Sequence, residues 1–341
     1  MVNAKQVLEL MLNGRDLEFD QASWMMQQFM EGVITPSQMS AMLIALRMKK
    51  ESVTEIAACA SVMRQKATRI PYEHPKLIDT CGTGGDASGS FNISTTVALL
   101  LAGGGYKIAK HGNRSMTSQS GSADCLEALG VHLDLTPQQV ADCIDQVNIG
   151  FLFAPALHSA MKHVMPVRKE IAVRTVFNVL GPLTNPAGAQ YQSLGLFDTG
   201  LVETIARVLK ELGSKSAYVF SGLSGLDEVC ISSDTQVCYL KPNGKLETFL
   251  FNPEDYGFQK APLESIRGGT PLENAALARQ ILQGDIDDPR SDIVAINAGF
   301  AVSAADACSL KEGFEKSRTL LREGVGLTAI DRLVEISHSF D

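Results

Sequence analysis

The sequence predicts an α/β protein that carries a small helical region at its N-terminus. The first 66 residues read as consecutive short helices, with apolar side chains at helical spacing. From Pro75 onward, short strands alternate with helices instead. The length of 341 residues exceeds the roughly 100–200 residues of a usual domain. We therefore expect a helical domain over residues 1–68 and an α/β domain over residues 75–341.

Two capping sequences mark helix starts. Thr35 is followed by a proline at the first helical position and by Gln38, which completes a capping box. Thr136, Pro137 and Gln139 repeat the device. In the α/β part, strands are expected over residues 76–80, 106–109, 216–221, 234–240 and 245–250. Helices are expected over residues 94–102, 122–129, 272–282, 292–303 and 310–322.

Charge and cysteine content exclude several classes of protein. Lys and Arg total 30 against 38 for Asp and Glu, so the net charge of −8 disfavours binding of nucleic acid or anionic lipid. The seven cysteines are scattered without a C-x-x-C pair, which favours a reducing, cytoplasmic compartment over a disulfide framework or zinc ribbon. The most apolar stretch is far shorter than the roughly 20 residues of a membrane span.

Glycines are concentrated in one part of the chain, with nine of 29 lying in residues 82–121. The segment Gly82–Asp86 (GTGGD) follows an expected strand and precedes an expected helix. Backbone N–H groups of such a turn, together with the helix N-terminus, can hold phosphate. The alternative is a turn that only lets strand and helix pack closely. The P-loop and Rossmann spacings are both absent.

A second polar cluster runs from Lys110 to Ser122. Between Thr80 and Ser122 the cations Lys107, Lys110 and Arg114 face a single acid, Asp86, and five hydroxyl side chains follow. This composition suits a ligand with several phosphates and ribose hydroxyls, although a solvated surface loop would look similar.

The adjacent acids Asp227 and Glu228 follow a glycine-containing stretch. Two carboxylates on a loop can hold Mg²⁺ and bridge it to a phosphate, whereas the ordinary role of such a pair is a solvated helix start. His158 and His163 are five residues apart, which does not align zinc ligands on one helix face. Cys81 is interpreted as a packing residue.

Taken in order along the chain, several motifs resemble anthranilate phosphoribosyltransferases. The resemblance covers almost the whole chain. Its motifs are Gly82–Asp86, Asn92–Thr95, Lys110–Arg114, Ser120–Asp124, His158–Lys162, Pro166–Arg168, Arg174–Pro186, Gly225–Glu228, Gly268–Gly269 and Glu273–Ala275.

The resemblance implies a homodimer with a mixed central sheet of the nucleoside phosphorylase/phosphoribosyltransferase type and a helical domain that includes a returning segment near residues 166–186. It implies the joining of anthranilate to 5-phosphoribosyl 1-diphosphate with release of diphosphate, in tryptophan biosynthesis. No general base is evident, because an aromatic amine is already neutral at pH 7.

The resemblance also implies residue roles. Contacts to the phosphoribosyl donor fall on Gly82, Gly85, Asp86, Ser90, Asn92, Ser94, Thr95, Lys110, Ser118 and Ser122. Contacts to anthranilate fall on Gly82, Asn113, His158 and Arg168. Ligands to Mg²⁺ fall on Ser94, Asp227 and Glu228.

Four positions depart from the family's pattern, which has Gly at 87, Thr at 90, Pro at 159 and Gly at 172. This chain has Ala87, Ser90, Ser159 and Ala172. Ala87 could stiffen the first loop and Ser159 could reshape the acceptor pocket. Two other functions stay open: a pyrimidine-nucleoside phosphorylase, which shares the fold, and a nucleic-acid-binding relative without activity, which should be basic.

Overall fold

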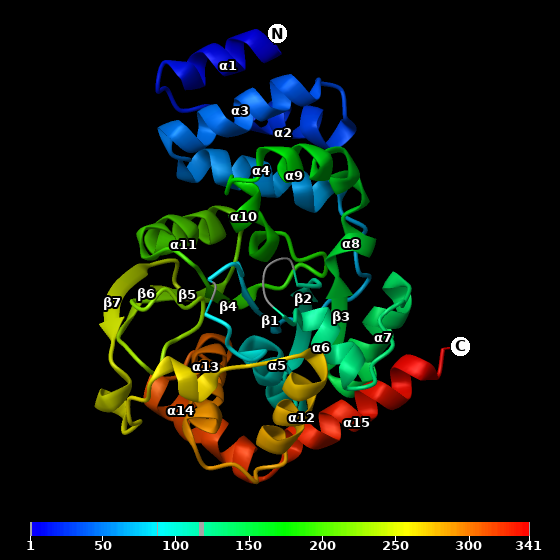
Figure 1. Ribbon diagram of the computed structural model, residues 1–341, viewed down its shortest axis with the longest axis vertical. Coiled ribbons are helices and arrows are strands. Elements are labelled where there is room, and N and C mark those ends of the chain that lie inside the picture. The colour runs from blue at the N-terminus through cyan, green and yellow to red at the C-terminus, as the bar shows by residue number, and fades with distance from the viewer. Residues whose placement is uncertain (1, 87, 116–118, 341) are drawn as a thin grey trace.

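The computed structural model describes residues 2–86, 88–115 and 119–340. Its helical region lies at one end of the molecule, at the top of Figure 1. It contains α1 (Ala4–Leu12), α2 (Phe19–Glu31), α3 (Pro36–Lys49) and α4 (Val53–Lys66). Both predicted capping boxes are confirmed, at the starts of α3 and of α7 (Pro137–Val147).

A mixed sheet of seven strands forms the centre of the remaining chain, which confirms the predicted fold class. The strand order is β3-β2-β1-β4-β5-β6-β7. Strands β1 to β5 are parallel to one another, whereas β6 pairs antiparallel with both β5 and β7. The strands are β1 (Leu77–Gly82), β2 (Lys107–Gly112), β3 (Ile149–Phe153), β4 (Tyr191–Gly195), β5 (Ser216–Gly222), β6 (Thr235–Leu240) and β7 (Leu246–Phe251).

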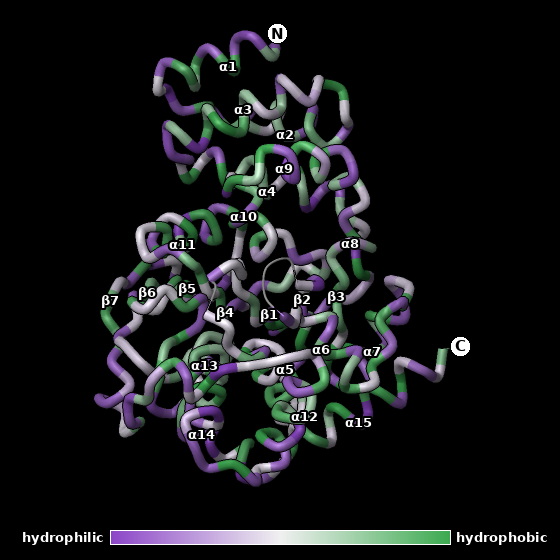
Figure 2. Tube along the Cα trace, viewed as in Figure 1, coloured by the Kyte–Doolittle hydropathy of each residue, from purple (hydrophilic) through white to green (hydrophobic). Residues whose placement is uncertain are grey.

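Helices cover both faces of this sheet. On one face α5 (Ile93–Gly103) and α13 (Pro289–Asp306) pack against the strands, with α12 (Pro271–Leu282), α14 (Leu310–Arg322) and α15 (Val325–His338) outside them. On the other face α11 (Val202–Glu211) lies against β5 and β6 and contacts α4. Figure 2 shows hydrophobic residues concentrated along α5 and α13, whereas the outer helix α1 alternates between hydrophobic and hydrophilic residues.

After β3 the chain returns to the helical region before it re-enters the sheet. It passes through α8 (Ala154–Leu157), α9 (Met165–Ile171) and α10 (Phe177–Leu180), and α9 packs against α3. The chain then forms β4 on the far side of β1. The chain thus leaves β1 toward β2 on one side, and β4 lies on the other side of β1. The carboxyl ends of two such neighbouring strands are the usual ligand position in open α/β sheets.

Several elements differ from the sequence expectation. β2 continues to Gly112 rather than ending at Ala109, because Lys110 and His111 have buried polar partners. Strands β3 and β4 and helices α11 and α15 were not anticipated, since short apolar strands lack a distinctive period. In the described part of the chain, no single helix is long and apolar enough to cross a membrane. Only α13 and α14 together pass that test, and they are bent by 120°.

Candidate active site

The glycine segment Gly82–Asp86 begins at the carboxyl end of β1, and α5 starts at Ile93, seven residues after its last residue. Gly82 pairs in register with Gly195 of β4. A Cβ atom at Gly82 would overlap the Asp227 side chain, and one at Gly195 would overlap the Asp227 carbonyl oxygen. These two glycines therefore let the loop that carries Asp227 rest directly on the ends of both strands.

Hydrogen bonds fix the acidic loop to the glycine segment and to α5. The Gly84 N–H donates to Asp227 Oδ2 at 2.7 Å, and the Ser94 N–H donates to Glu228 Oε1 at 3.1 Å. Ser94 is in the first turn of α5, whose N-terminus favours negative charge. The predicted metal ligands Ser94, Asp227 and Glu228 are thus brought together.

The carboxyl groups of Asp86, Asp227 and Glu228 lie close to one another. Burial, followed by the nearby Asp86 carboxylate, raises the pKa of Asp227 to about 7. Burial and the charge of Asp227 also raise the pKa of Glu228. Asp86 Oδ2 is buried without a hydrogen-bond partner among the described residues. Among the described residues, no three His, Cys, Asp or Glu side chains lie close enough together to hold a metal ion by themselves. The donor set, carboxylate and hydroxyl oxygens, nevertheless fits a hard cation such as Mg²⁺.

Lys110 is buried beneath the first turn of α5 and is not exposed at the surface of the site. Its side chain is 2% exposed, and Nζ donates to the Thr80 carbonyl and, at 3.2 Å, to Ser94 Oγ. The cation therefore joins β1, β2 and the first turn of α5, close to the acids.

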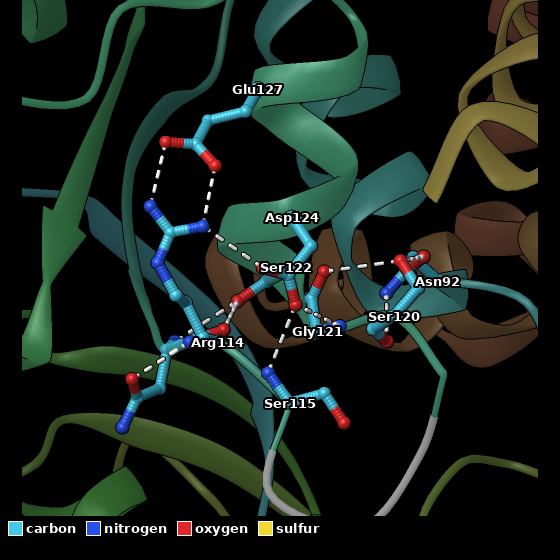
Figure 3. Close-up of polar contacts among 9 residues, drawn as sticks. Asn92, Arg114, Ser115, Ser120, Gly121, Ser122, Asp124 and Glu127 are labelled. Carbon is cyan, nitrogen blue, oxygen red and sulfur yellow. Dashed lines mark hydrogen bonds and ion pairs between the residues drawn. The ribbon is translucent and has the colours of Figure 1, made fainter. Parts of the chain in front are cut away.

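The other two cations of this stretch, Lys107 and Arg114, both have partners within the protein. Arg114 pairs with Asp124 and Glu127 of α6 (Ser122–Ala128), as Figure 3 shows. Lys107 donates to two carbonyls at the end of α7. The sequence interpretation of a local positive excess is wrong, because two acids just beyond the counted range neutralise Arg114.

The remaining donor candidates lie around the same loops. Asn92 accepts a hydrogen bond from Ser120 Oγ at 3.1 Å and donates to the Ser120 carbonyl. Ser122 Oγ accepts from the Asn113 N–H, and Ser90 Oγ accepts from Ser88 Oγ. Thr95 Oγ1 is buried without a hydrogen-bond partner among the described residues. Ser118 and Ala87 lie outside the described residues.

The acceptor candidates include a buried histidine pair. His158 Nε2 lies 3.3 Å from His111 Nε2, and His111 Nδ1 lies 3.2 Å from the Gly181 carbonyl oxygen. That carbonyl requires the N–H on His111 Nδ1, so His158 donates to His111. Burial lowers the pKa of His111 to about 3, with the His158 charge as the next cause, and burial lowers the pKa of His158 to about 4.

Arg168 lies in α9 with its guanidinium carbon 5.4 Å from the centroid of the Phe177 ring. Burial lowers its pKa. No carboxylate of the described residues pairs with it, so the ion pair with Glu170 that would give it a purely structural role is not formed. Asn113 is exposed, and its Oδ1 accepts the Arg114 N–H at 2.7 Å.

Comparisons with known proteins agree with this arrangement. Residues 74–327 match the a/b domain of a glycosyl transferase family, and residues 5–67 match its helical bundle domain. An anthranilate phosphoribosyltransferase of Symbiobacterium thermophilum is 50% identical over 335 residues, or 98% of each chain. The chain belongs to the anthranilate phosphoribosyltransferase family. The family and the pentosyltransferase class predicted from the motifs are therefore confirmed.

Solved structures of family members share the fold. The anthranilate phosphoribosyltransferase of Thermus thermophilus superposes with a TM-score of 0.93 at 42% identity, covering 97% of this chain and 99% of that one. The Saccharomyces cerevisiae enzyme in complex with PRPP and Mg superposes with a TM-score of 0.84 at 27% identity, covering 94% and 92%.

Sequence reasoning missed two side chains that shape this family site. Asn274 donates to Asn92 Oδ1 at 2.9 Å and accepts the Gly269 N–H. Buried Asp79 accepts from the His111 N–H and from Asn185 Nδ2. Both residues stand within or beside quoted motifs, but Asn92 is 182 residues from Asn274 and His111 is 32 residues from Asp79, so spacing carried no signal for these two contacts.

Proposed function

We propose that this chain transfers the phosphoribosyl group of 5-phosphoribosyl 1-diphosphate to the amine of anthranilate at the carboxyl ends of β1, β2 and β4. The observation that carries the proposal is the seating of the Asp227–Glu228 loop on Gly82, Gly84 and Ser94. Backbone N–H groups, a buried lysine and carboxylates then meet at one place, which suits a diphosphate held through a divalent cation.

The donor contacts proposed are those implied by the family motifs. Two buried oxygens without partners support them, Asp86 Oδ2 and Thr95 Oγ1, because such atoms are normally satisfied by a ligand or solvent. The proposed set is Gly82, Gly85, Asp86, Ser90, Asn92, Ser94, Thr95, Lys110, Ser118 and Ser122.

The metal proposed for this site is Mg²⁺, held by Asp227, Glu228 and Ser94. The oxygen-only donor set supports it, as does the yeast relative described with PRPP and Mg. When bound, Mg²⁺ would offset the charge of the departing diphosphate. Lys110 adds a fixed positive charge beneath Ser94, and the N-terminus of α5 adds a partial one.

The acceptor site proposed combines Gly82, Asn113, His158 and Arg168. The guanidinium of Arg168, which has no ion-pair partner among the described residues, can bind the carboxylate of anthranilate through two parallel hydrogen bonds. Holding the neutral amine beside the ribose would supply much of the rate, so no general base is required.

We also propose the domain division at residues 1–68 and 75–341, with the segment near 166–186 returning to the helical domain. The contact of α9 with α3 supports this return. A homodimer in the cytoplasm completes the proposal, and its support is the family resemblance and seven free thiols.

The direct test is the loss of anthranilate fluorescence when purified protein, 5-phosphoribosyl 1-diphosphate and Mg²⁺ are combined. We expect the anthranilate fluorescence to fall only when the protein, 5-phosphoribosyl 1-diphosphate and Mg²⁺ are all present. A second arm supplies thymidine and phosphate. Phosphorolysis of thymidine without anthranilate consumption would replace the proposal with a pyrimidine-nucleoside phosphorylase. Salt-dependent retention on DNA would favour the binding-protein alternative.

A further inference from the structure

Arg174 is an exposed residue between α9 and α10 that reaches the glycine segment. Its Nη2 donates to the Gly85 carbonyl at 2.5 Å, and its guanidinium carbon lies 3.9 Å from the centroid of the Phe197 ring. Among the residues that the structure describes, no carboxylate pairs with this side chain. Its charge therefore interacts with a backbone carbonyl and an aromatic face.

Phe197 is itself bound to the same segment. The Phe197 N–H donates to Thr83 Oγ1 at 3.1 Å, and the Thr83 N–H donates to the Gly195 carbonyl at 3.0 Å. Arg174 and Phe197 thus bracket Thr83–Gly85 from both ends. Gly84 and Gly85 have φ of +67° and +73° and no side chains to pack, so these contacts, together with the Gly84 N–H bond to Asp227, determine where their backbone lies.

The backbone of Arg174 connects this bracket to the opposite side of the site. Its carbonyl accepts from Arg47 Nη1 of α3 at 2.7 Å. Arg174 also lies two positions after Ala172, the C-cap residue of α9, and α9 carries Arg168. One residue therefore joins the helical region and the proposed acceptor helix to the proposed donor loop.

We propose that Arg174 is a positioning residue that couples the two substrate sites. It holds the Thr83–Asp86 backbone in the conformation that receives the diphosphate, and ordering of α9 by the acceptor strengthens that hold. Coupling between sites is reciprocal, so each ligand should tighten the other by the same factor. This inference rests on the substrate assignments of the proposed function.

Shape as well as charge matters at this position. A guanidinium can donate from Nη2 to Gly85 while its face lies on Phe197, whereas a lysine ammonium keeps the charge but cannot make both contacts. Arg174→Lys therefore separates positioning from simple attraction of a phosphate. Arg207→Ala is a matched control, since Arg207 is an exposed arginine of α11 that pairs with Glu203.

The experiment measures binding of diphosphate with Mg²⁺ by calorimetry, with and without saturating anthranilate, a pair that cannot react. In the wild type we expect anthranilate to tighten diphosphate several-fold. Arg174→Ala and Arg174→Lys should both abolish most of this factor and raise KM for the phosphoribosyl donor about tenfold with a smaller change in kcat. Arg207→Ala should behave as wild type, and all melting temperatures should stay close to that of the wild type.

Three outcomes would overturn the inference: a wild type without coupling, an Arg174→Lys variant that keeps wild-type donor KM, or an Arg174→Ala variant that keeps full coupling. Each leaves the proposed function intact provided that the wild type consumes anthranilate. Absence of that activity in the wild type would instead refute the proposed function, so the two failures are distinguishable.

Discussion

The proposed donor and acceptor sides of the site are built from different kinds of structure. On the donor side, the ends of β1 and β2, the first turn of α5 and the acidic loop are joined by Lys110, by two N–H to carboxylate bonds and by glycines at points of close approach. On the acceptor side, Arg168 stands on the seven-residue helix α9, contacts an aromatic ring and has no ion pair among the described residues.

The sheet therefore carries the proposed charged chemistry, while the helix proposed to bind the acceptor packs against the helical region. A rigid donor side keeps diphosphate groups at fixed positions. The proposed acceptor side stands on a separate short helix, which packs against α3 of the helical region. Changes on the donor side should therefore alter chemistry strongly, and changes on the acceptor side should alter specificity and stability more mildly.

The largest effect is expected from Asp227→Asn combined with Glu228→Gln. Turnover should fall more than about 100-fold, because the metal ligands lose their charge. The amide oxygens can still accept from Gly84 and Ser94, so the fold should persist. Burial raises the pKa of both carboxyl groups, so neutral replacements should also not lower the melting temperature. Activity across a Mg²⁺ titration beside a thermal melt checks this, and normal activity at ordinary Mg²⁺ would refute the metal assignment.

The motifs of the proposed donor side stand in continuous stretches of sequence, and each has a local physical reason that points to a phosphate or metal site. A glycine turn between strand and helix, and adjacent acids after glycines, are readable as spacing. The tertiary contacts between these motifs could not be predicted from the sequence. Lys110 meets Thr80 and Ser94 from 30 and 16 residues away, and the strand that carries it was expected to end before it.

Acceptor-side organisation was much less predictable. The two imidazoles that meet at 3.3 Å are 47 residues apart, and nothing in either neighbourhood indicates the other. The same limit applies outside the acceptor side, in the second polar cluster, where Arg114 was interpreted as an unpaired cation although two acids of the following helix pair with it. Tertiary contacts decide both cases, and a single sequence does not contain them.

On the donor side, Lys110→Met tests whether the buried cation serves the diphosphate. Donor affinity should fall about tenfold to hundredfold, because one charge-assisted interaction is lost. The Thr80 carbonyl loses its donor, so stability should fall by about 1–3 kcal/mol as well. Calorimetry at a temperature well below the melt separates the two effects. Unchanged donor affinity in a folded variant would sink the assignment.

On the acceptor side, Arg168→Ala should raise KM for anthranilate about tenfold while the donor KM hardly moves. Aniline, which lacks the carboxylate, supplies the control. It should be a poor acceptor for the wild type and lose little further in the variant. Equal losses for anthranilate and aniline would show that Arg168 acts through the fold or the donor site.

The buried histidine pair predicts a loss of stability at acid pH, whereas the raised pKa values of Asp227 and Glu228 act in the opposite direction. The folded pKa values, about 3 for His111 and about 4 for His158, lie below the ordinary 6.5. Between these values the unfolded chain binds protons that the folded chain does not, so stability falls as pH drops below about 6.5. At pH 5.5 each histidine should cost about 1.4 kcal/mol relative to pH 7.5. Denaturant titrations of wild type and His158→Gln at both pH values isolate this contribution: the variant should lose about 1.4 kcal/mol less than the wild type. Equal losses in the two proteins would contradict the burial of the pair.

The smallest effect is expected at the end of α9. Ala172 adopts φ +48° and ψ +26°, a left-handed conformation that costs an L-residue roughly 1–2 kcal/mol. Ala172→Gly removes this cost but adds the greater chain entropy of glycine in the unfolded state, about 0.4–1 kcal/mol. A net stabilisation of about 0.5 kcal/mol should remain, measured as a higher denaturant midpoint.

Ala307 provides the matched control for that prediction, because it is also exposed and is the C-cap residue of α13, with φ +54°. Ala307→Gly should stabilise the protein by a similar amount without altering kinetics, since α13 lies far along the chain from the acceptor helix and packs on the sheet. Ala172→Gly should in addition loosen α9 and raise KM for anthranilate slightly, up to about twofold, while leaving the donor KM unchanged. If the two variants shift stability in opposite directions, backbone strain is not what Ala172 contributes. If both leave anthranilate KM unchanged, the acceptor helix is as rigidly held as the donor loop, and the contrast between the two sides of the site disappears.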